Sequence, residues 1–473
     1  MIADIFNSIK KPLFRPYLNL GAQIDIPTGT FEEGRGGSMI LNGGLSPVTA
    51  IVALPNNYKT SVAVYMDLRT MEWFKKSYHL FYDSENTFSA NRHIQQARQY
   101  DGLSHIDLLD YPYFRITDKS VYDGNELFEV FNAILKSQEK DKSAVYTSPF
   151  VDPRTKELKK AVYPSIFTID SFSGLDTKGV LEQLDKNDAG SSENNTVYMK
   201  SANAKTQIMR QVNSLTARAG GYTVLTAHVG EHIKIDPYAA TVKELTHLNA
   251  SLKIKDVCRN FKTLPHNMWF VSKCSIAQSS KKTTLYPRSA EEEYLNDKDL
   301  NELIVVNLRG KNGPSGDPIT WIISQRDGLL PHLSNYHFLK INKYWGMEGN
   351  DRFHTLAIYP DEKLSRTTVR GKLDKDHRLA NAMKITCDLL QIYQMKRDEY
   401  SDILCDAKTL YDDLKAMGYN WDDILDARQH WCAVEEEDVQ GVETYSIIDL
   451  LNMRAGRYVP FWFTKEQKEA LKI

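Results

Sequence analysis

The sequence has little cysteine and no long apolar run. Five of its 473 residues are cysteine, an odd number, and no two of them form a C-x-x-C pair. This scatter excludes a disulfide framework and a thiolate zinc site, so we expect reduced thiols and a cytoplasmic location. No stretch of about 18 consecutive apolar residues occurs, which excludes a membrane-spanning helix of ordinary length. We therefore expect no membrane partner.

The sequence also lacks an excess of charge of either sign. It has 59 basic and 61 acidic residues, for a net charge of −2. Domains that bind nucleic acid non-specifically usually carry a basic surface, so any such binding here must come from local basic loops. The 42% apolar and 25% charged residues are ordinary for a globular protein, and 473 residues suffice for two or three domains.

Seven short apolar runs alternate with longer helical patterns between about residue 47 and residue 345. Unbroken apolar strands that alternate with helices are typical of a mostly parallel sheet whose two faces are both covered. The sequence therefore predicts the α/β class. The predicted strands are 49–54, 78–82, 165–169, 222–226, 268–272, 303–306 and 319–323.

The chain divides into three predicted parts. Residues 1–46 form an N-terminal arm with two glycine-rich turns, and residues 1–20 have the apolar spacing of a short amphipathic helix. Residues 47–345 form the core, interrupted by polar loops at 186–195 and 278–299. Residues 346–473 are mainly helical, as in 377–396 and 403–417, and tryptophans at 421, 431 and 462 predict a small core of their own.

A degenerate phosphate loop follows the first core strand. The segment A-L-P-N-N-Y-K-T nearly fits G-x-x-x-x-G-K-[ST], with alanine and tyrosine in place of the two glycines. In such a loop, backbone N–H groups and a helix N-terminus hold phosphates, Lys59 reaches the β/γ oxygens, and Thr60 binds Mg²⁺. Without its glycines, the segment alone could also be an ordinary strand, turn and helix. The candidate nucleotide contacts are Ala53, Leu54, Pro55, Asn56, Asn57, Tyr58, Lys59, Thr60 and Ser61.

Polar residues end three further predicted strands. Asp83 and Glu85 follow the second strand, Asp170 follows the third, and His228 follows the fourth. Ligands of parallel sheets bind at the carboxyl ends of the strands, so these side chains are expected to share one edge. Glu85 is a candidate for polarising the water that attacks a γ-phosphate, and Asp170 for supporting Mg²⁺. Any one of these residues alone could simply cap a strand.

In this order, the segments resemble the RecA-like recombinases, most closely phage recombinases of the UvsX type. The shared features are the phosphate loop, F-Y-D-S-E at 81–85, I-D-S at 169–171, and a histidine at a strand end. That group also has an aromatic residue before the phosphate-loop lysine, which accounts for Tyr58. The helix predicted at 204–212 has its counterpart there, and the resemblance covers roughly residues 40–340.

The resemblance implies a RecA-like P-loop ATPase core that binds ATP and Mg²⁺. Lys59 and Thr60 would bind phosphate and Mg²⁺, Glu85 would be the catalytic carboxylate, and Asp170 would be the Walker B acid. His228 would couple the nucleotide state to a DNA-binding loop. Arg309 and Lys311 resemble the basic pair that reaches the ATP of a neighbouring subunit, so activity would require self-association into a filament or ring. A solvated basic turn is an equally open interpretation of these two residues.

The segment from His228 to about Pro265 is the candidate DNA-binding region. It is longer than the corresponding loop of the family, and apolar residues at 242, 245, 248 and 252 predict that it is partly helical. Its concentration of basic residues is unusual for this near-neutral chain and points to contact with DNA phosphates, although a solvated helix face would look similar. The candidate DNA contacts are Lys243, Lys253, Lys255, Arg259 and Lys262.

Three functions remain open at this point. The first is a recombinase that binds single-stranded DNA, promotes strand exchange in DNA recombination and repair, and works with other replication or recombination proteins. The second is a replicative helicase of the DnaB type, which the segment 312–316 resembles equally well, although only about 50 residues precede the phosphate loop. The third is a P-loop protein that no longer hydrolyses ATP and serves as a scaffold. If a phage encodes the chain, its location is the host cytoplasm.

Overall fold

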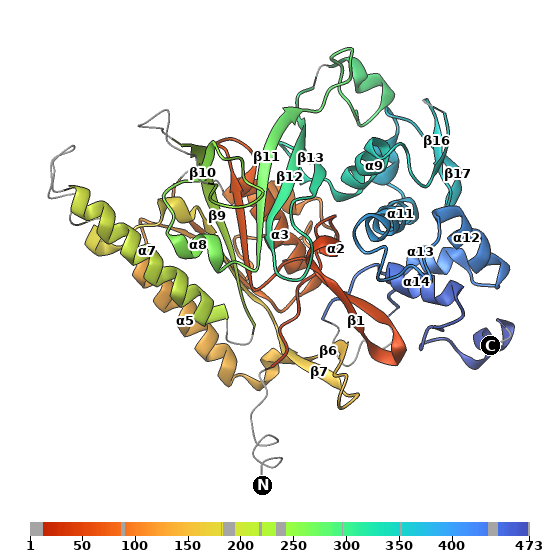
Figure 1. Cartoon of the computed structure of the whole chain (residues 1–473), viewed down its shortest axis with the longest axis horizontal. Helices are drawn as coiled ribbons and strands as arrows, with labels where there is room; N and C mark the ends of the chain where they lie inside the picture. Colours follow the sequence, from red (N-terminus) through yellow and green to blue (C-terminus); the bar gives the residue numbers. More distant parts are fainter. Residues whose placement is uncertain are drawn as a thin grey trace, which may run out of the picture.

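A computed structural model of the chain describes residues 13–86, 90–180, 182, 194–216, 220–232, 243–295, 297–350, 352–433 and 443–471. A ten-stranded sheet forms its centre, with helices on both faces and a largely helical C-terminal region at one side (Figure 1). Of the predicted arm helix at 1–20, residues 13–20 are described and are not helical, and residues 1–12 lie outside the described part. Most of the predicted loop at 186–195 also lies outside it.

The central sheet confirms the predicted α/β class and its mostly parallel character. All seven predicted runs are strands of this sheet, namely β3, β4, β8, β9, β11, β12 and β13. The strand order is β14-β13-β12-β11-β3-β9-β8-β4-β5, and the six from β11 to β5 are mutually parallel. The last two predicted runs, β12 and β13, pair antiparallel instead, as do β10 and the short β14. A β-hairpin connects β11 to β12 without a crossover helix, so this end of the sheet departs from the pattern of alternating strand and helix. The strands are β3 (Val48–Ala53), β4 (Tyr78–Asp83), β5 (Phe114–Asp118), β8 (Ser165–Asp170), β9 (Gly221–Glu231), β10 (Leu252–Ile254), β11 (Asn267–Ile276), β12 (Leu300–Gly310), β13 (Pro318–Ser324) and β14 (Gly328–Leu329).

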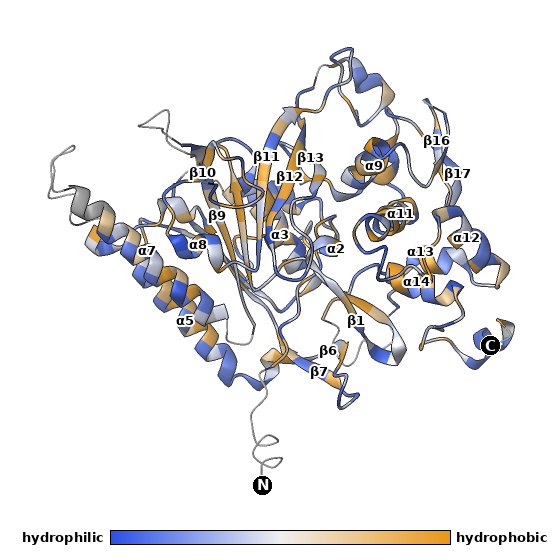
Figure 2. Cartoon of the chain, viewed as in Figure 1, coloured by the Kyte–Doolittle hydropathy of each residue, from blue (hydrophilic) through white to orange (hydrophobic). Residues whose placement is uncertain are grey.

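Both faces of the central strands are buried, which explains why their sequences are continuously apolar. In β3, Val48, Ala50 and Val52 pack into one hydrophobic cluster, whereas Ile51 and Ala53 pack into another on the opposite face. Successive side chains of a strand point to opposite faces, so a strand covered on both sides needs an apolar residue at nearly every position. Figure 2 shows this as orange strands between helices whose outer faces are blue.

Different helices cover the two faces. The helix α3 (Lys59–Trp73) lies on one face, and α5 (Gly124–Lys140) and α7 (Asn194–Thr216) lie side by side on the other (Figure 1). A capping box fixes the start of α5: Asp123 accepts from the backbone N–H of Glu126, whose side chain accepts from that of Asp123. Shorter elements join these layers, namely α4 (Ala90–Ala97), η2 (Lys142–Ala144), η3 (Phe172–Gly174), α8 (Arg259–Thr263) and η4 (Ala290–Leu295).

The N-terminal arm contains a small hairpin that packs against a second small hairpin. The arm contributes α2 (Asp25–Thr28), β1 (Thr30–Glu33), η1 (Arg35–Gly37) and β2 (Met39–Asn42), and β1 pairs with β2. The second hairpin consists of β6 (Val145–Val151) and β7 (Leu158–Val162). Two ion pairs join them, from Lys156 to Glu33 at 2.6 Å and from Lys159 to Glu32 at 2.8 Å.

The C-terminal region shares one hydrophobic cluster with Ile26 and Phe31 of the arm and with Leu300 and Ile322 of the central sheet, so the predicted core of its own is not separate. Trp421 is buried in this cluster and Trp462 packs against it, but Trp431 does not belong to it. The ring of Trp431 lies 5.1 Å from that of Phe74, beside α3, because the chain crosses back to the central sheet. The elements are α9 (Pro331–Ile341), β15 (Met347–Gly349), β16 (His354–Leu356), β17 (Tyr359–Leu364), α10 (Val369–Leu373), α11 (His377–Met395), α12 (Ala407–Ala416), α13 (Trp421–Asp426), α14 (Ile447–Arg454) and α15 (Lys465–Ala470).

The region after residue 345 confirms the predicted helices at 377–396 and 403–417, the second of which starts later, at Ala407. It also holds the small sheet β15-β16-β17, which the sequence did not predict because its strands are short and polar. The domain boundaries at 46 and 345 stay predictions. Among the described residues, no helix is both long and apolar enough to cross a membrane.

We predict that Phe131→Ala destabilises the protein by about 3–5 kcal/mol, since it deletes a large side chain from a packed core. Phe131 is buried, and its ring stacks on that of Phe167 in β8 at 4.1 Å, holding α5 to the sheet. Urea denaturation followed by circular dichroism measures the change. Tyr294→Ala is the matched control, because Tyr294 is 79% exposed and its loss should change stability by less than about 0.5 kcal/mol. Equal stability losses in the two variants would contradict the prediction.

Candidate nucleotide-binding site

Two residues of the loop between β3 and α3 adopt the left-handed region. They are Asn56 (φ 65°) and Tyr58 (φ 58°), and α3 starts at Lys59 directly after Tyr58. Left-handed residues next to right-handed ones turn successive N–H groups inward and favour anions, as does a helix N-terminus. That this segment is a phosphate loop stays a prediction.

Tyr58 stands at a position where glycine would be unstrained. A non-glycine residue in the left-handed region costs about 1–2 kcal/mol. Two contacts of the side chain offset this cost. The ring packs against the hydrophobic cluster beside α3, and the hydroxyl accepts a hydrogen bond from Asn301 Nδ2 at 2.9 Å. The aromatic residue therefore ties the loop to the start of β12.

The register of the sheet brings the predicted strand ends together. Ala53 is level with His228 on β9, and Asp83 is level with Asp170 on β8. Lys59 is buried and its Nζ lies 3.3 Å from Asp170 Oδ1 and 3.8 Å from Glu85 Oε1. Five side chains that the sequence placed on four separate segments thus meet at one edge: Lys59, Thr60, Glu85, Asp170 and His228.

Glu85 is held in its ionised form. Its Oε1 contacts His228 Nε2 at 2.7 Å and accepts a hydrogen bond from Ser171 Oγ at 2.6 Å. The hydrogen bond with His228 lowers the pKa of Glu85 from 4.5 to about 2, and the hydrogen bond with Ser171 and the charge of Lys59 act in the same direction. A permanently ionised carboxylate at this position is able to accept a hydrogen bond from a water molecule.

The oxygen ligands present at the site fit a magnesium ion. The hydroxyl of Thr60 donates to Asp170 Oδ2, so one hydroxyl and one carboxylate already converge at the start of α3. Hard cations such as Mg²⁺ prefer oxygen ligands of this kind, usually one or two carboxylates with phosphates and water. Thr226 Oγ1 donates to the other oxygen of Asp170 and fixes the orientation of the carboxylate.

An open cleft of about 730 Å³ lies over the phosphate loop, a size within the range of small-molecule pockets. Its lining includes the loop residues Pro55 to Ser61, together with Arg92 of α4, Gln325 after β13, Glu85 and His228. Arg92 Nε is buried without a hydrogen-bond partner in the described part of the chain. The cleft therefore offers a second cation besides Lys59.

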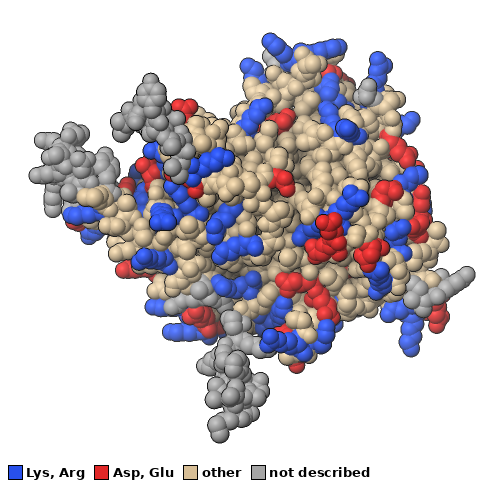
Figure 3. Space-filling view, in the orientation of Figure 1, with Lys and Arg blue, Asp and Glu red and all other residues tan. Residues whose placement is uncertain are grey.

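The predicted DNA-binding segment starts at the same edge. The strand β10 pairs antiparallel with the end of β9, and the backbone N–H of Lys255 donates to the carbonyl of His228 at 2.8 Å. Lys243, Lys255 and Arg259 are exposed, whereas Lys262 pairs with Glu244 at 2.7 Å. Lysine and arginine side chains surround β10 and α8 on the face drawn in Figure 3, with acidic side chains among them.

The apolar spacing of this segment did not produce the expected helix at 242–252. Residues 233–242 lie outside the described part, residues 243–251 form turns, and 252–254 form β10. Among the residues of this segment that the structure describes, helix occurs only in α8. Leu248 is buried in the cluster that covers β9, so the periodic leucines anchor a turn instead of forming a helix stripe.

The structure does not bring Arg309 and Lys311 to this site. Arg309 pairs with Met268 at the start of β11, so it lies at the amino-terminal edge of the parallel strands, opposite the phosphate loop. Its Nε donates to the carbonyl of Pro265 at 3.1 Å. Burial, with the charges of Lys311, Arg15 and Arg309, lowers the pKa of His266 to about 4, so this edge is positively charged. A contribution to the nucleotide of a second copy stays a prediction.

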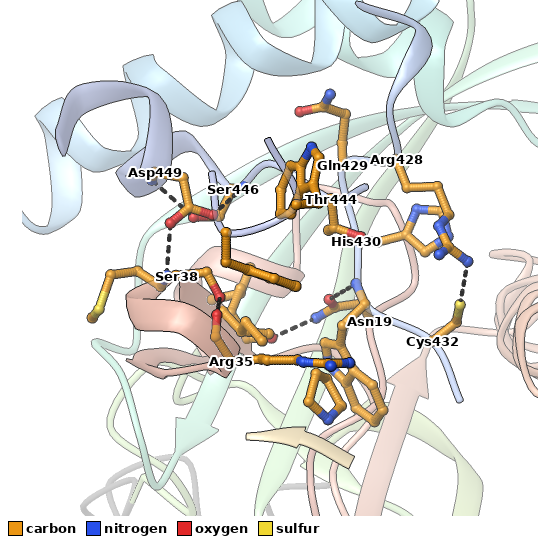
Figure 4. A pocket seen from close by; sticks show the side chains of 17 residues that line it. Asn19, Arg35, Ser38, Arg428, Gln429, His430, Cys432, Thr444, Ser446 and Asp449 are labelled. Carbon is orange, nitrogen blue, oxygen red and sulfur yellow. Dashed lines mark hydrogen bonds between the residues drawn. The ribbon is translucent and has the colours of Figure 1, made fainter. Parts of the chain in front are cut away.

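A second pocket, enclosed and mostly apolar, lies between the arm hairpin and the C-terminal region (Figure 4). Its walls include Arg35, Trp431 and Trp462, and the buried Asp449 accepts from the backbone N–H of Met39 at 2.6 Å. The pocket holds only about 50 Å³ of free space, against about 730 Å³ in the cleft. A nucleotide fits the cleft and not this pocket.

The sequence matches no protein-family model and no curated protein. Among solved structures, the chain is similar to the RadB recombinase, at 14% identity over 61% of this chain and 92% of that chain, with a TM-score of 0.33. A likeness this remote does not establish a function. The function must therefore be argued from the residues of the cleft.

Sequence reasoning found the residues that end strands and missed those that support them. Thr226 stands two positions before His228 on β9 and so faces the same side, a period-two signal that was available in the sequence. Ser171 follows Asp170 directly and was overlooked as a partner of Glu85. Arg92 lies seven residues after Glu85 in a helix, and nothing in the sequence pattern distinguishes it.

We predict that His228→Ala raises the pKa of Glu85 from about 2 toward its usual value of 4.5, because it removes the largest cause of the shift. A carboxylate whose pKa is lower in the folded state than in the unfolded state stabilises the fold. This contribution is complete at a pH above the pKa of the unfolded state and is lost as the pH falls through the pKa of the folded state. At pH 4.5 the ¹³C chemical shift of the Glu85 carboxyl group should be that of an ionised carboxylate in the native protein. The signal is assigned by its loss in Glu85→Gln. It should be shifted about halfway toward the protonated position in His228→Ala.

His266→Ala is the control, since it removes an imidazole at the opposite edge of the sheet. Its Glu85 signal should match that of the native protein. A Glu85 signal that stays fully ionised at pH 4.5 in His228→Ala would show that His228 does not set this pKa.

Proposed function

We propose that the chain is a DNA-dependent ATPase of RecA-like type that acts on single-stranded DNA in recombination or repair. The observation that carries the proposal is the meeting of Lys59, Glu85 and Asp170 at the carboxyl edge of a parallel sheet, under a loop in which two left-handed residues precede α3. A buried lysine between two carboxylates at such a loop is suited to receive a phosphate.

Each residue has a distinct part in the proposed reaction. Lys59 would turn from its carboxylate partners to the β/γ oxygens of ATP. Glu85, ionised and oriented by Ser171 and His228, would accept a hydrogen bond from the water that attacks the γ-phosphate. Mg²⁺ bound by Thr60 and Asp170 would neutralise part of the phosphate charge. Arg92 would add a positive charge to the lining of the cleft.

His228 would link hydrolysis to DNA binding. Its side chain contacts Glu85, and its backbone carbonyl accepts from Lys255 in the candidate DNA-binding segment. A change in the Glu85–His228 contact when nucleotide binds would therefore reach β10 through one residue. Arg309 and Lys311, at the opposite edge, would contact the nucleotide of a second copy, so the proposal includes self-association in a filament or ring.

We predict that Lys59→Ala and Glu85→Gln each lower the rate of ATP hydrolysis, stimulated by single-stranded DNA, by at least about 100-fold. Lys59→Ala removes the phosphate contact and should also weaken binding of a fluorescent ATP analogue. Glu85→Gln keeps the shape of the side chain and should still bind it. Phosphate release measured with and without single-stranded DNA tests both variants.

Lys281→Ala and Glu291→Gln are matched controls on an exposed loop away from the cleft and should keep the native rate. If the native protein binds the analogue but releases no phosphate with any DNA, the chain is a non-hydrolysing P-loop scaffold. If it unwinds a forked duplex with one polarity, it is a helicase of the DnaB type. Strand exchange without such unwinding would support the recombinase.

We also predict that the double variant Lys255→Ala/Arg259→Ala weakens binding of single-stranded DNA in the presence of ATP. Both side chains are exposed and neither has a described acidic partner. The slope of log K against log salt should fall by about 0.7 for each phosphate that the variant no longer neutralises. Fluorescence anisotropy at several salt concentrations measures the slope. Lys281→Ala/Lys282→Ala removes the same charge elsewhere, and an equal effect from it would argue against a specific contact.

A further inference from the structure

A cluster of tyrosines lies at the amino-terminal edge of β4 and β5, opposite the nucleotide cleft. Tyr78 begins β4 and is 42% exposed, although it starts a strand that is otherwise mostly buried. Its ring lies 5.3 Å from that of Tyr113, which in turn lies 5.5 Å from that of Tyr111, and both pairs are edge-to-face. The five residue steps from Tyr78 to Asp83 span about 17 Å, so the cluster is well separated from Glu85.

The tyrosines border a hollow of about 390 Å³. Tyr78 and Tyr113 form one wall, and the end of α5 with the turn after it forms the other. Both polar atoms of the Gln138 side chain, on that second wall, already have hydrogen-bond partners. Its Nε2 donates to the carbonyl of Tyr163 at 2.6 Å, and its Oε1 accepts from Ser165 at 2.7 Å. The hollow is therefore held open by a fixed polar frame, with aromatic rings exposed on one side.

A cation lies next to the tyrosines. Arg115 is exposed, and its Nη1 donates to the carbonyls of Tyr111 and Phe114, both at 2.7 Å. These bonds hold the guanidinium at the backbone of Tyr111, and Arg115 forms no ion pair among the described residues. Asp141 lines the opposite wall, where Ser143 donates to it and lowers its pKa, so it is ionised and repels phosphate from that side.

We propose that this tyrosine patch (Tyr78, Tyr111, Tyr113 and Arg115) binds single-stranded nucleic acid. Unpaired bases would stack on the exposed ring of Tyr78 and the half-buried ring of Tyr113, and a phosphate would lie at Arg115. Accessible rings next to a fixed cation are the combination that holds single strands without regard to sequence, because every base has a face to stack. Paired bases are already stacked inside a duplex and cannot use the rings.

The patch is separate from the segment 243–262, which lies at the carboxyl edge of the sheet beside His228. It requires neither ATP nor hydrolysis, so its test is made without nucleotide and is independent of the proposed ATPase. A strand held at both edges of the sheet would contact the same subunit at two places.

The test uses the full chain, EDTA, no nucleotide, and fluorescein-labelled oligothymidylate followed by anisotropy. Tyr78→Ala/Tyr113→Ala should weaken binding by about 30-fold or more, the loss expected when two stacking contacts are removed. Tyr78→Phe/Tyr113→Phe keeps both rings and should bind within about threefold of the native protein. Tyr294→Ala, which removes a tyrosine that lies outside the patch and is 79% exposed, should bind as the native protein does.

A second measurement uses only native protein and so does not depend on the folding of a variant. An oligonucleotide with 5-iodouracil should photocrosslink to the peptides that contain Tyr78 and Tyr113. The proposal is overturned if the double alanine variant binds oligothymidylate as tightly as the native protein, or if crosslinks occur only at 243–262. Equal competition by duplex DNA or by polyglutamate would also overturn it.

Discussion

Lys59 is a buried ammonium group, and much of the site follows from the need to keep its charge stable. A charge removed from water is costly unless it is paired and hydrogen-bonded. Asp170 and Glu85 provide that pairing, and each carboxylate is in turn held by further donors, Asp170 by Thr60 and Thr226, and Glu85 by Ser171 and His228. The residues of the site thus form one connected polar network. The protein itself therefore orients the two carboxylates, whereas Lys59 would have to leave them to reach a phosphate.

That network depends on the register of the parallel sheet. The strands β3, β9, β8 and β4 are adjacent and parallel, so residues at the same level on each strand meet at one edge. A shift of one residue in any strand would turn its polar residue to the other face. The alternation of buried residues in β3 prevents such a shift, because Ile51 and Val52 occupy different hydrophobic clusters. Packing of the core therefore fixes the chemistry at its edge.

These facts explain how far the sequence alone could lead. Continuous apolar runs predicted all seven strands, and the polar residue after a run predicted Asp170, Glu85 and His228, because both signals are local. The pattern of a mostly parallel sheet did not predict that β12 pairs antiparallel with its sequence neighbours β11 and β13. The position of Trp431 depends on a contact with the distant Phe74 and has no local signal. The leucines at 245, 248 and 252 were misleading, since a turn that anchors on a hydrophobic cluster can carry the same spacing as a helix.

The helix α3 joins this edge to the rest of the molecule, because both of its ends are fixed to segments far away in the sequence. At its start, Tyr58 contacts Asn301 of β12. At its end, the ring of Trp73 stacks on that of His430 at 3.3 Å, where burial lowers the pKa of His430 far enough to keep the ring neutral. A phosphate that drew Lys59 away from Asp170 and Glu85 would pull on the start of α3. Because the end of α3 is stacked on His430, the helix cannot tilt independently of the C-terminal region. If α3 moves, the segment around His430 must move with it or the Trp73–His430 stack must break. This segment of the C-terminal region is therefore coupled to the candidate nucleotide site.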